Sequence, residues 1–339
     1  MSLDVNEIDR IGPDGMVWSL YFQPGEQPVG ASQAVVSQRL AGRALPDKSW
    51  LWLHFDAVPA LATQRLGRLG WLPEIARDAL IGADGGLRLE AEDGAVFGAL
   101  PAFDDTLTDF DKELCAFRFA LLPDLLITTR RRRVPALYRI YRSLVAGTEV
   151  ASAAALIDLA LLEFGGGLRH NIGELDDYLD QAEDVLLSDD RDSNLHHVGG
   201  IVGKTRRRST MLRRVIAPMD RIMRSEDLAL PEWAEEDLLD RSRRQLHAAL
   251  DDLLALQDRA RSLQDELAAR QAEETNRRLY VVSVMTTLML PATFVTGFFG
   301  MNTGGMFLSG SHAGTIEAGF VCFLFMAFTW LLMKRARIL

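Results

Sequence analysis

The chain has 339 residues, a formal net charge of −10 and a hydrophobic content of 48%. The acidic balance argues against nucleic acid as a partner and is compatible with attracting cations. Its two cysteines, Cys115 and Cys322, provide neither a disulfide framework nor a cysteine-based metal motif. Residues 1–7 lack a basic end and an apolar core, so we expect no secretory signal and a cytosolic amino-terminal region.

The first 150 residues predict a cytoplasmic mixed α/β domain. Short segments rich in β-branched and aromatic residues, bounded by Gly, Pro or Asp, predict strands. They are residues 16–22, 50–55, 87–92, 95–100, 115–122 and 125–129. Helical segments alternate with them at residues 59–69, 73–80 and 135–145.

The sequence contains no Walker-type loop, no G-x-G-x-x-G after a strand and no H-E-x-x-H. The Asp-Gly-Gly at 84–86 predicts a turn rather than a phosphate-binding loop. We therefore expect neither an ATP-driven pump nor an enzyme, and no covalently bound cofactor.

Residues 151–232 predict a helical hairpin whose two helices end near residues 188 and 224. Residues 174–192 contain nine acids and one arginine, whereas residues 204–214 contain six basic residues and no acid. Attraction between the two faces is the simpler interpretation. The alternative is an acidic site that gathers divalent cations, with His196 and His197 nearby for a softer ion.

Residues 233–278 predict a stalk helix, since they lack proline and glycine up to Thr275 and favour helix throughout. Apolar residues recur with heptad spacing, at Leu239, Leu246, Leu253, Ala260 and Leu267, with Ala249, Leu256 and Leu263 offset by three. Continued into the next segment, the helix would have about 65 residues and a length of roughly 100 Å. So long a helix needs partners from other subunits or from the soluble domain.

Two segments predict membrane-spanning helices, at 279–300 and 315–334. Residues 279–299 are 21 residues without a charge, and about 20 apolar residues span a bilayer. Basic residues precede the first span and follow the second, and the connection 303–314 has no Lys or Arg. The positive-inside rule therefore places both termini, including the basic tail 335–339, in the cytoplasm and the loop 301–314 in the periplasm.

The first span carries a stripe of polar and small residues on one face. Steps of three and four residues place these together: Asn276, Leu279, Ser283, Thr286, Leu290, Thr293 and Gly297. Such a stripe serves helix packing in lipid and equally suits a wet axis in a ring of helices. Topology alone also allows a simple membrane anchor.

The span ends in Gly300-Met301-Asn302, and this tripeptide at the outer end of the penultimate span resembles the CorA superfamily of divalent-cation transporters. Further segments resemble its zinc-transporting ZntB branch. They are residues 274–277, 290–293, 296–299 and 303–305, and upstream Trp52-Leu53-His54-Phe55-Asp56 and residues 127–132.

The resemblance implies a funnel-shaped homopentamer in the lipid bilayer of the bacterial inner membrane. The stripe from Asn276 to Gly297 would then line a central pore, with Gly300, Met301 and Asn302 as the selectivity filter. The Asn302 amide would bind a hydrated cation, since Mg²⁺ gives up its waters reluctantly. Leu279 and Leu290 would form apolar constrictions that gate by dewetting.

The residues after the tripeptide separate two branches of the family. Magnesium transporters usually have an acidic loop there, whereas residues 303–314 contain His312 and no acid. We therefore expect Zn²⁺ as the transported substrate, with Mg²⁺, Co²⁺ or Ni²⁺ as alternatives. The competing class is a membrane scaffold or sensor that has kept the fold but does not conduct.

Overall fold

The computed structural model describes residues 12, 14–82, 86–103, 114–187, 195–225, 228–235, 239–301 and 314–335. It divides into two compact units, Met1–Leu263 and Gln264–Leu339. The division falls inside the predicted stalk.

The first unit contains a seven-stranded sheet in the order β2-β1-β3-β7-β6-β5-β4. The central pair, β3 and β7, is parallel, and every other pair is antiparallel. The strands are β1 (Met16–Phe22), β2 (Val29–Gly30), β3 (Trp50–Asp56), β4 (Arg88–Glu92), β5 (Ala95–Phe103), β6 (Leu114–Leu122) and β7 (Leu125–Arg130). The predicted mixed α/β domain is confirmed.

Helices cover both faces of the sheet, which is why β3 is buried over Trp50–Phe55. Leu51, Leu53 and Phe55 belong to a core with residues of α3 (Ala60–Gly67) and α4 (Glu74–Ile81). The alternate side chains of β3 point the other way, where Trp18 packs against Tyr138 of α5 (Pro135–Val145). The sequence prediction missed β2 and α2 (Gln33–Leu40).

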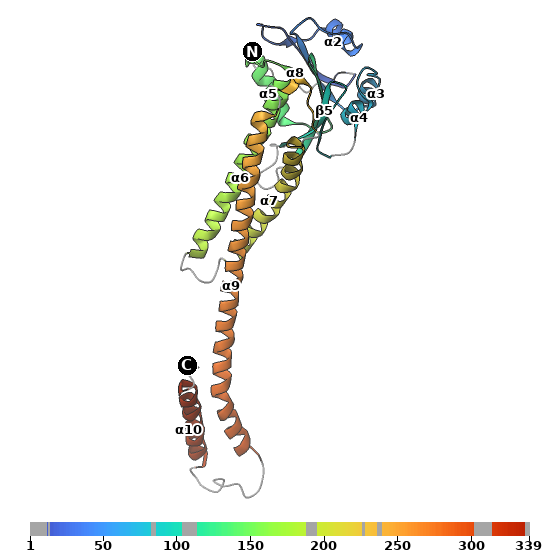
Figure 1. The fold of residues 1–339 in the computed structure, drawn as a ribbon. Helices are drawn as coiled ribbons and strands as arrows, with labels where there is room; N and C mark the ends of the chain where they lie inside the picture. Colours follow the sequence, from blue (N-terminus) through green and yellow to red (C-terminus); the bar gives the residue numbers. More distant parts are fainter. Residues whose placement is uncertain are drawn as a thin grey trace. The chain divides into compact units, whose positions relative to one another are not determined.

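Three helices form a bundle in the first unit: α6 (Ala153–Leu187), α7 (Leu195–Met223) and the first part of α9 (Asp240–Phe299) (Figure 1). Ser242 of α9 donates a hydrogen bond to Asp158 of α6. Arg213 of α7 lies 3.2 Å from the side-chain oxygen of Gln257. Further contacts join Arg259 of α9 to Glu183 of α6 and place His247 of α9 3.5 Å from Asp220 of α7. Together the four contacts show that α6 runs parallel and α7 antiparallel to α9.

The predicted heptad face of α9 is buried by this bundle. Its buried residues in the first unit are Leu246, Ala249, Leu253, Leu256, Ala260 and Leu263. Of the two partners that the long helix could have, this half therefore uses its own soluble domain.

The stalk helix begins later than the sequence predicts. A short helix, α8, covers Glu232–Glu235, and α9 starts only at Asp240. Leu239 is fully buried and has a φ of 80°, a conformation that no helix continues through. From Asp240 the helix runs for 60 residues and includes Pro291, so its predicted continuation into the first span is confirmed.

The second unit contains the remainder of α9 and α10 (Gly314–Arg335). Both helices are long and apolar enough to cross a membrane. The Cys322 Sγ lies 3.7 Å from the carbonyl oxygen of Ala292, which joins the two helices as a hairpin. The two predicted spans are therefore present as helices.

Candidate cation pathway

The seven residues of the predicted stripe, Asn276 to Gly297, all lie on α9 and are all exposed. The covered face of the same helix carries Val284, Leu288, Ala292, Val295 and Phe299, which are partly or fully buried. At about 100° per residue, the centres of the two faces are roughly half a turn apart. The stripe thus points away from α10.

The threonines of this stripe donate their hydroxyl protons to their own helix. Thr286 Oγ1 lies 2.8 Å from the carbonyl oxygen of Val282, and Thr293 Oγ1 lies 3.0 Å from that of Met289. Such back-bonding occupies the donor and leaves the oxygen lone pairs as acceptors. The exposed face therefore presents oxygen acceptors, which suit the water hydrogens around a hydrated cation.

Gly297, at the outer end of the stripe, has open space where a side chain would stand, with nothing within 4 Å of an added Cβ. No contact within the described residues therefore requires a glycine there. A helix of another subunit packed close to this position, or a solvent-filled path beside it, would explain why the residue is a glycine.

The predicted filter lies at the end of α9. The Gly300 amide donates to the carbonyl oxygen of Thr296 at 2.9 Å, and Met301 is exposed. A Cβ at Gly300 would stand 3.0 Å from that carbonyl oxygen, so a side chain there would crowd the last turn. Asn302, the predicted cation ligand, lies outside the described residues, as do residues 303–313.

The two upstream segments that resemble the ZntB branch are structural. They are neighbouring parallel strands in register, with His54 opposite Thr128. The Thr128 hydroxyl lies 2.9 Å from Trp52 Nε1 and 2.8 Å from His54 Nδ1, and all three side chains are buried. Asp56 and Arg130 form an ion pair at 3.6 Å. These residues hold the centre of the sheet together.

The acidic segment makes a contact that the sequence prediction missed. Asp176, Asp180 and Glu183 of α6 all pair with Arg259 of α9, at 2.6 Å for both Asp176 and Glu183. Arg259 donates hydrogen bonds to Glu183 and Asp180, and these bonds contribute most to raising its pKa. The stepwise spacing of the three acids was a signal for one face of a helix, but nothing in the sequence identified their partner.

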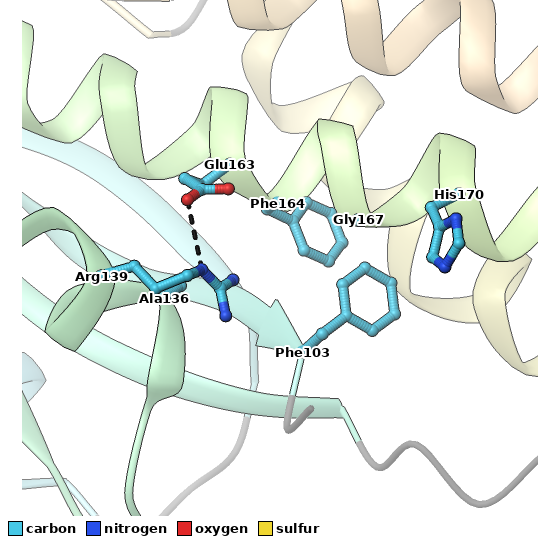
Figure 2. Close-up of a pocket in the computed structure, with 7 residues that line it drawn as sticks. All are labelled: Phe103, Ala136, Arg139, Glu163, Phe164, Gly167 and His170. Carbon is cyan, nitrogen blue, oxygen red and sulfur yellow. Dashed lines mark hydrogen bonds and ion pairs between the residues drawn. The ribbon is translucent and has the colours of Figure 1, made fainter. Parts of the chain in front are cut away.

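A cavity of about 400 Å³ lies in the soluble domain between β5, α5 and α6. Figure 2 shows Arg139 and Glu163 facing each other across it, 3.3 Å apart, with the stacked rings of Phe103 and Phe164 beside them. Its described lining has no Ser, Cys or Lys that could act as a nucleophile.

A family model described as "CorA-like Mg2+ transporter protein" matches residues 47–335. The chain therefore belongs to the CorA family.

Its similarity to zinc transport proteins named ZntB confirms the predicted branch. It is 28% identical to ZntB of Pectobacterium carotovorum subsp. carotovorum (strain PC1), over 89% of this chain and 87% of the relative. It is 30% identical to ZntB of Yersinia pseudotuberculosis serotype O:1b (strain IP 31758), over 75% and 77%.

Solved structures share the fold. The full-length CmaX protein has a TM-score of 0.74 at 24% identity, over 96% of this chain and 98% of that chain. The CorA magnesium transporter from Methanocaldococcus jannaschii has a TM-score of 0.65 at 14% identity, over 94% and 98%.

Proposed function

We propose that the chain is a subunit of a divalent-cation transporter that carries Zn²⁺ first and Mg²⁺, Co²⁺ or Ni²⁺ as alternatives, by a passive or proton-coupled route. The subunit works as a homopentamer in the bacterial inner membrane, with both termini in the cytoplasm. Membership of the CorA family and similarity to proteins named for zinc transport support this proposal. The cation is the substrate, and no covalently bound cofactor is needed.

The exposed stripe of α9 carries the proposal. A face that points away from α10 and presents threonine oxygens would line a central pore when five copies surround one axis. Hydroxyl oxygens can accept hydrogen bonds from the water shell of a cation without removing that shell. Leu279 and Leu290, exposed on the same face, would form the apolar constrictions.

The outer mouth would be formed by Gly300, Met301 and Asn302. The carbonyl end of α9 contributes partial negative charge at this end of the helix. The Asn302 amide oxygen adds a neutral acceptor for a hydrated cation. Because the following residues 303–314 contain no acid, the mouth depends on these dipoles rather than on carboxylates.

Flux through reconstituted protein tests the proposal. Purified full-length protein in liposomes that contain a zinc-sensitive dye should take up Zn²⁺, and Asn302→Ala should reduce the rate roughly tenfold or more. The matched control is Ser309→Ala, which changes a side chain of similar size in the same connection and should leave the rate unchanged. Repeating the assay with and without a proton gradient separates passive from coupled transport.

A non-conducting scaffold or sensor is the second candidate, favoured by the connection without acids. Wild-type protein with a mass of five chains but without flux of Zn²⁺, Mg²⁺, Co²⁺ or Ni²⁺ would establish it and overturn transport.

A further inference from the structure

Another cavity, of about 450 Å³, lies where the amino end of α9 meets α6. It is lined by the connection between α5 and α6, by one face of α6 and by the first turns of α9. Its lining carries charges of both signs: the acids Glu149, Asp158 and Asp240, and the bases Arg241 and Arg244. The first unit thus has a cavity that combines carboxylates and guanidinium groups.

The carboxylate of Asp158 is buried without a cationic partner. Asp158 is 9% exposed and accepts a hydrogen bond from the hydroxyl of Ser242. It forms no other hydrogen bond and no ion pair within the described part of the chain. Buried carboxylates are normally paired with a cation or hydrogen-bonded through both oxygens. Asp158 therefore provides an anchored site for a positively charged donor.

The two arginines of the cavity do not supply that donor. Arg241 and Arg244 are both exposed, and neither forms a hydrogen bond or an ion pair with any described residue. They follow the amino end of α9, where the helix dipole favours negative charge. The same cavity therefore offers a buried carboxylate and, separately, two guanidinium groups that can bind an anion.

Charges of opposite sign that line one cavity without pairing are complementary to a ligand that carries both charges. An α-amino acid has an ammonium group, which donates hydrogen bonds, and a carboxylate, which a guanidinium can bind through two parallel N–H groups. Val150, Leu159 and Leu162 also line the cavity and are partly buried. Such apolar surface suits an apolar ligand side chain.

A metal ion fits this cavity less well than an ammonium group. The two guanidinium groups would repel a divalent cation at the same place. In the parts of the chain that the structure describes, no three His, Cys, Asp or Glu side chains are placed to hold a metal. An ammonium group needs only the single buried carboxylate of Asp158.

We propose that this cavity binds a zwitterionic ligand of the α-amino acid class that has an apolar side chain. Its ammonium group donates to Asp158, and its carboxylate accepts hydrogen bonds from Arg241 and Arg244. Since Asp158 belongs to α6 and the arginines belong to α9, the bound ligand joins the two helices at the amino end of α9. This binding does not depend on cation transport, and it is measured without flux.

Isothermal titration calorimetry of the full-length protein in detergent, with L-leucine as the probe, tests the site. Two further probes separate the charges: isopentylamine lacks the carboxylate of leucine, and isocaproate lacks its ammonium group. L-leucine should bind, and each single-charge probe should bind at least about tenfold more weakly, because each loses one set of charge-assisted hydrogen bonds.

Two variants test the residues of the site. Asp158→Asn keeps an acceptor for Ser242 but removes the charge, so the Kd for L-leucine should rise about tenfold or more. Arg244 is exposed, so Arg244→Gln should fold normally, and it should raise the Kd about tenfold. The matched control is Asp177→Asn, at an exposed position of α6 outside the cavity, which should leave the Kd unchanged.

Three results would overturn the proposal. They are the absence of L-leucine binding to the wild type, equal affinity for L-leucine and either single-charge probe, and an unchanged Kd in Arg244→Gln.

Discussion

The two halves of α9 differ in the burial of their apolar side chains. In the first unit, Leu253 on the heptad face is fully buried, whereas Leu290 in the second unit is 67% exposed. The first half packs against α6 and α7 of the same chain. Over Leu279–Phe299, the second half is covered on the face that carries Val295 and is otherwise exposed. The first half therefore buries its apolar face within one chain. The exposed apolar residues of the second half can be covered only by lipid or by other subunits.

The largest expected effect is a loss of stability when a buried leucine of the first half is shortened, and it tests this comparison directly. Leu253→Ala should destabilise the protein by about 2–5 kcal/mol, because it removes a buried side chain and leaves a cavity. Thermal unfolding in detergent measures the loss as a lower Tm. Leu290→Ala, the same substitution on the exposed half, should shift the Tm little and change Zn²⁺ flux instead. Equal losses of Tm in the two variants would contradict the division of the helix.

A second pair of variants sharpens the assignment of the exposed face. Thr286→Val combined with Thr293→Val removes two outward acceptors, each worth about 1 kcal/mol, so cation flux should fall roughly thirtyfold. Thr296→Val is the control, because this threonine bonds its own helix at 3.1 Å in the same way but lies off the stripe. Cation flux into liposomes is measured for the wild type, the double variant and the control variant. A stronger effect at Thr296 would place the pathway on another face.

The smallest effect concerns the charged contacts of the buried half. Arg259→Gln should cost about 1 kcal/mol, because Arg259 bridges to three acids of α6. Arg261→Gln should cost less than about 0.5 kcal/mol, since Arg261 pairs at 3.8 Å with Asp258 on its own helix. Denaturant unfolding at low and high salt compares them, and salt should reduce the Arg259 effect. A free energy of unfolding of Arg259→Gln equal to that of the wild type at low salt would show the bridge to be unimportant.

Local patterns predicted much of this fold. The predicted strand 16–22 matches β1, and the predicted helix 135–145 matches α5, because alternation and proline positions act within each segment. Strand β2 was missed, since two residues, Val29 and Gly30, carry no periodicity. The start of α9 was missed because helix propensity continues through Leu239, and only its tertiary setting imposes a positive φ.

The grouping of the stripe residues on one face of α9 was predictable for a similar reason, and their role in a pathway stays a prediction. Helical periodicity groups residues Asn276 to Gly297 without any tertiary information. The Arg259 bridge depends on which helices become neighbours, and charge content alone does not decide that. The same limit applies to the acidic segment, whose partner lies on α9, more than 70 residues away.

The parallel pair at the centre of the sheet has a consequence for biosynthesis. Trp52 and His54 meet Thr128 across 76 and 74 residues of chain, so the sheet cannot close until β7 has left the ribosome. Closure of such distant segments is slow compared with helix formation. Both strands nevertheless emerge well before residues 279–299 are synthesised. The sheet can therefore fold as the chain grows, before the first predicted span is synthesised.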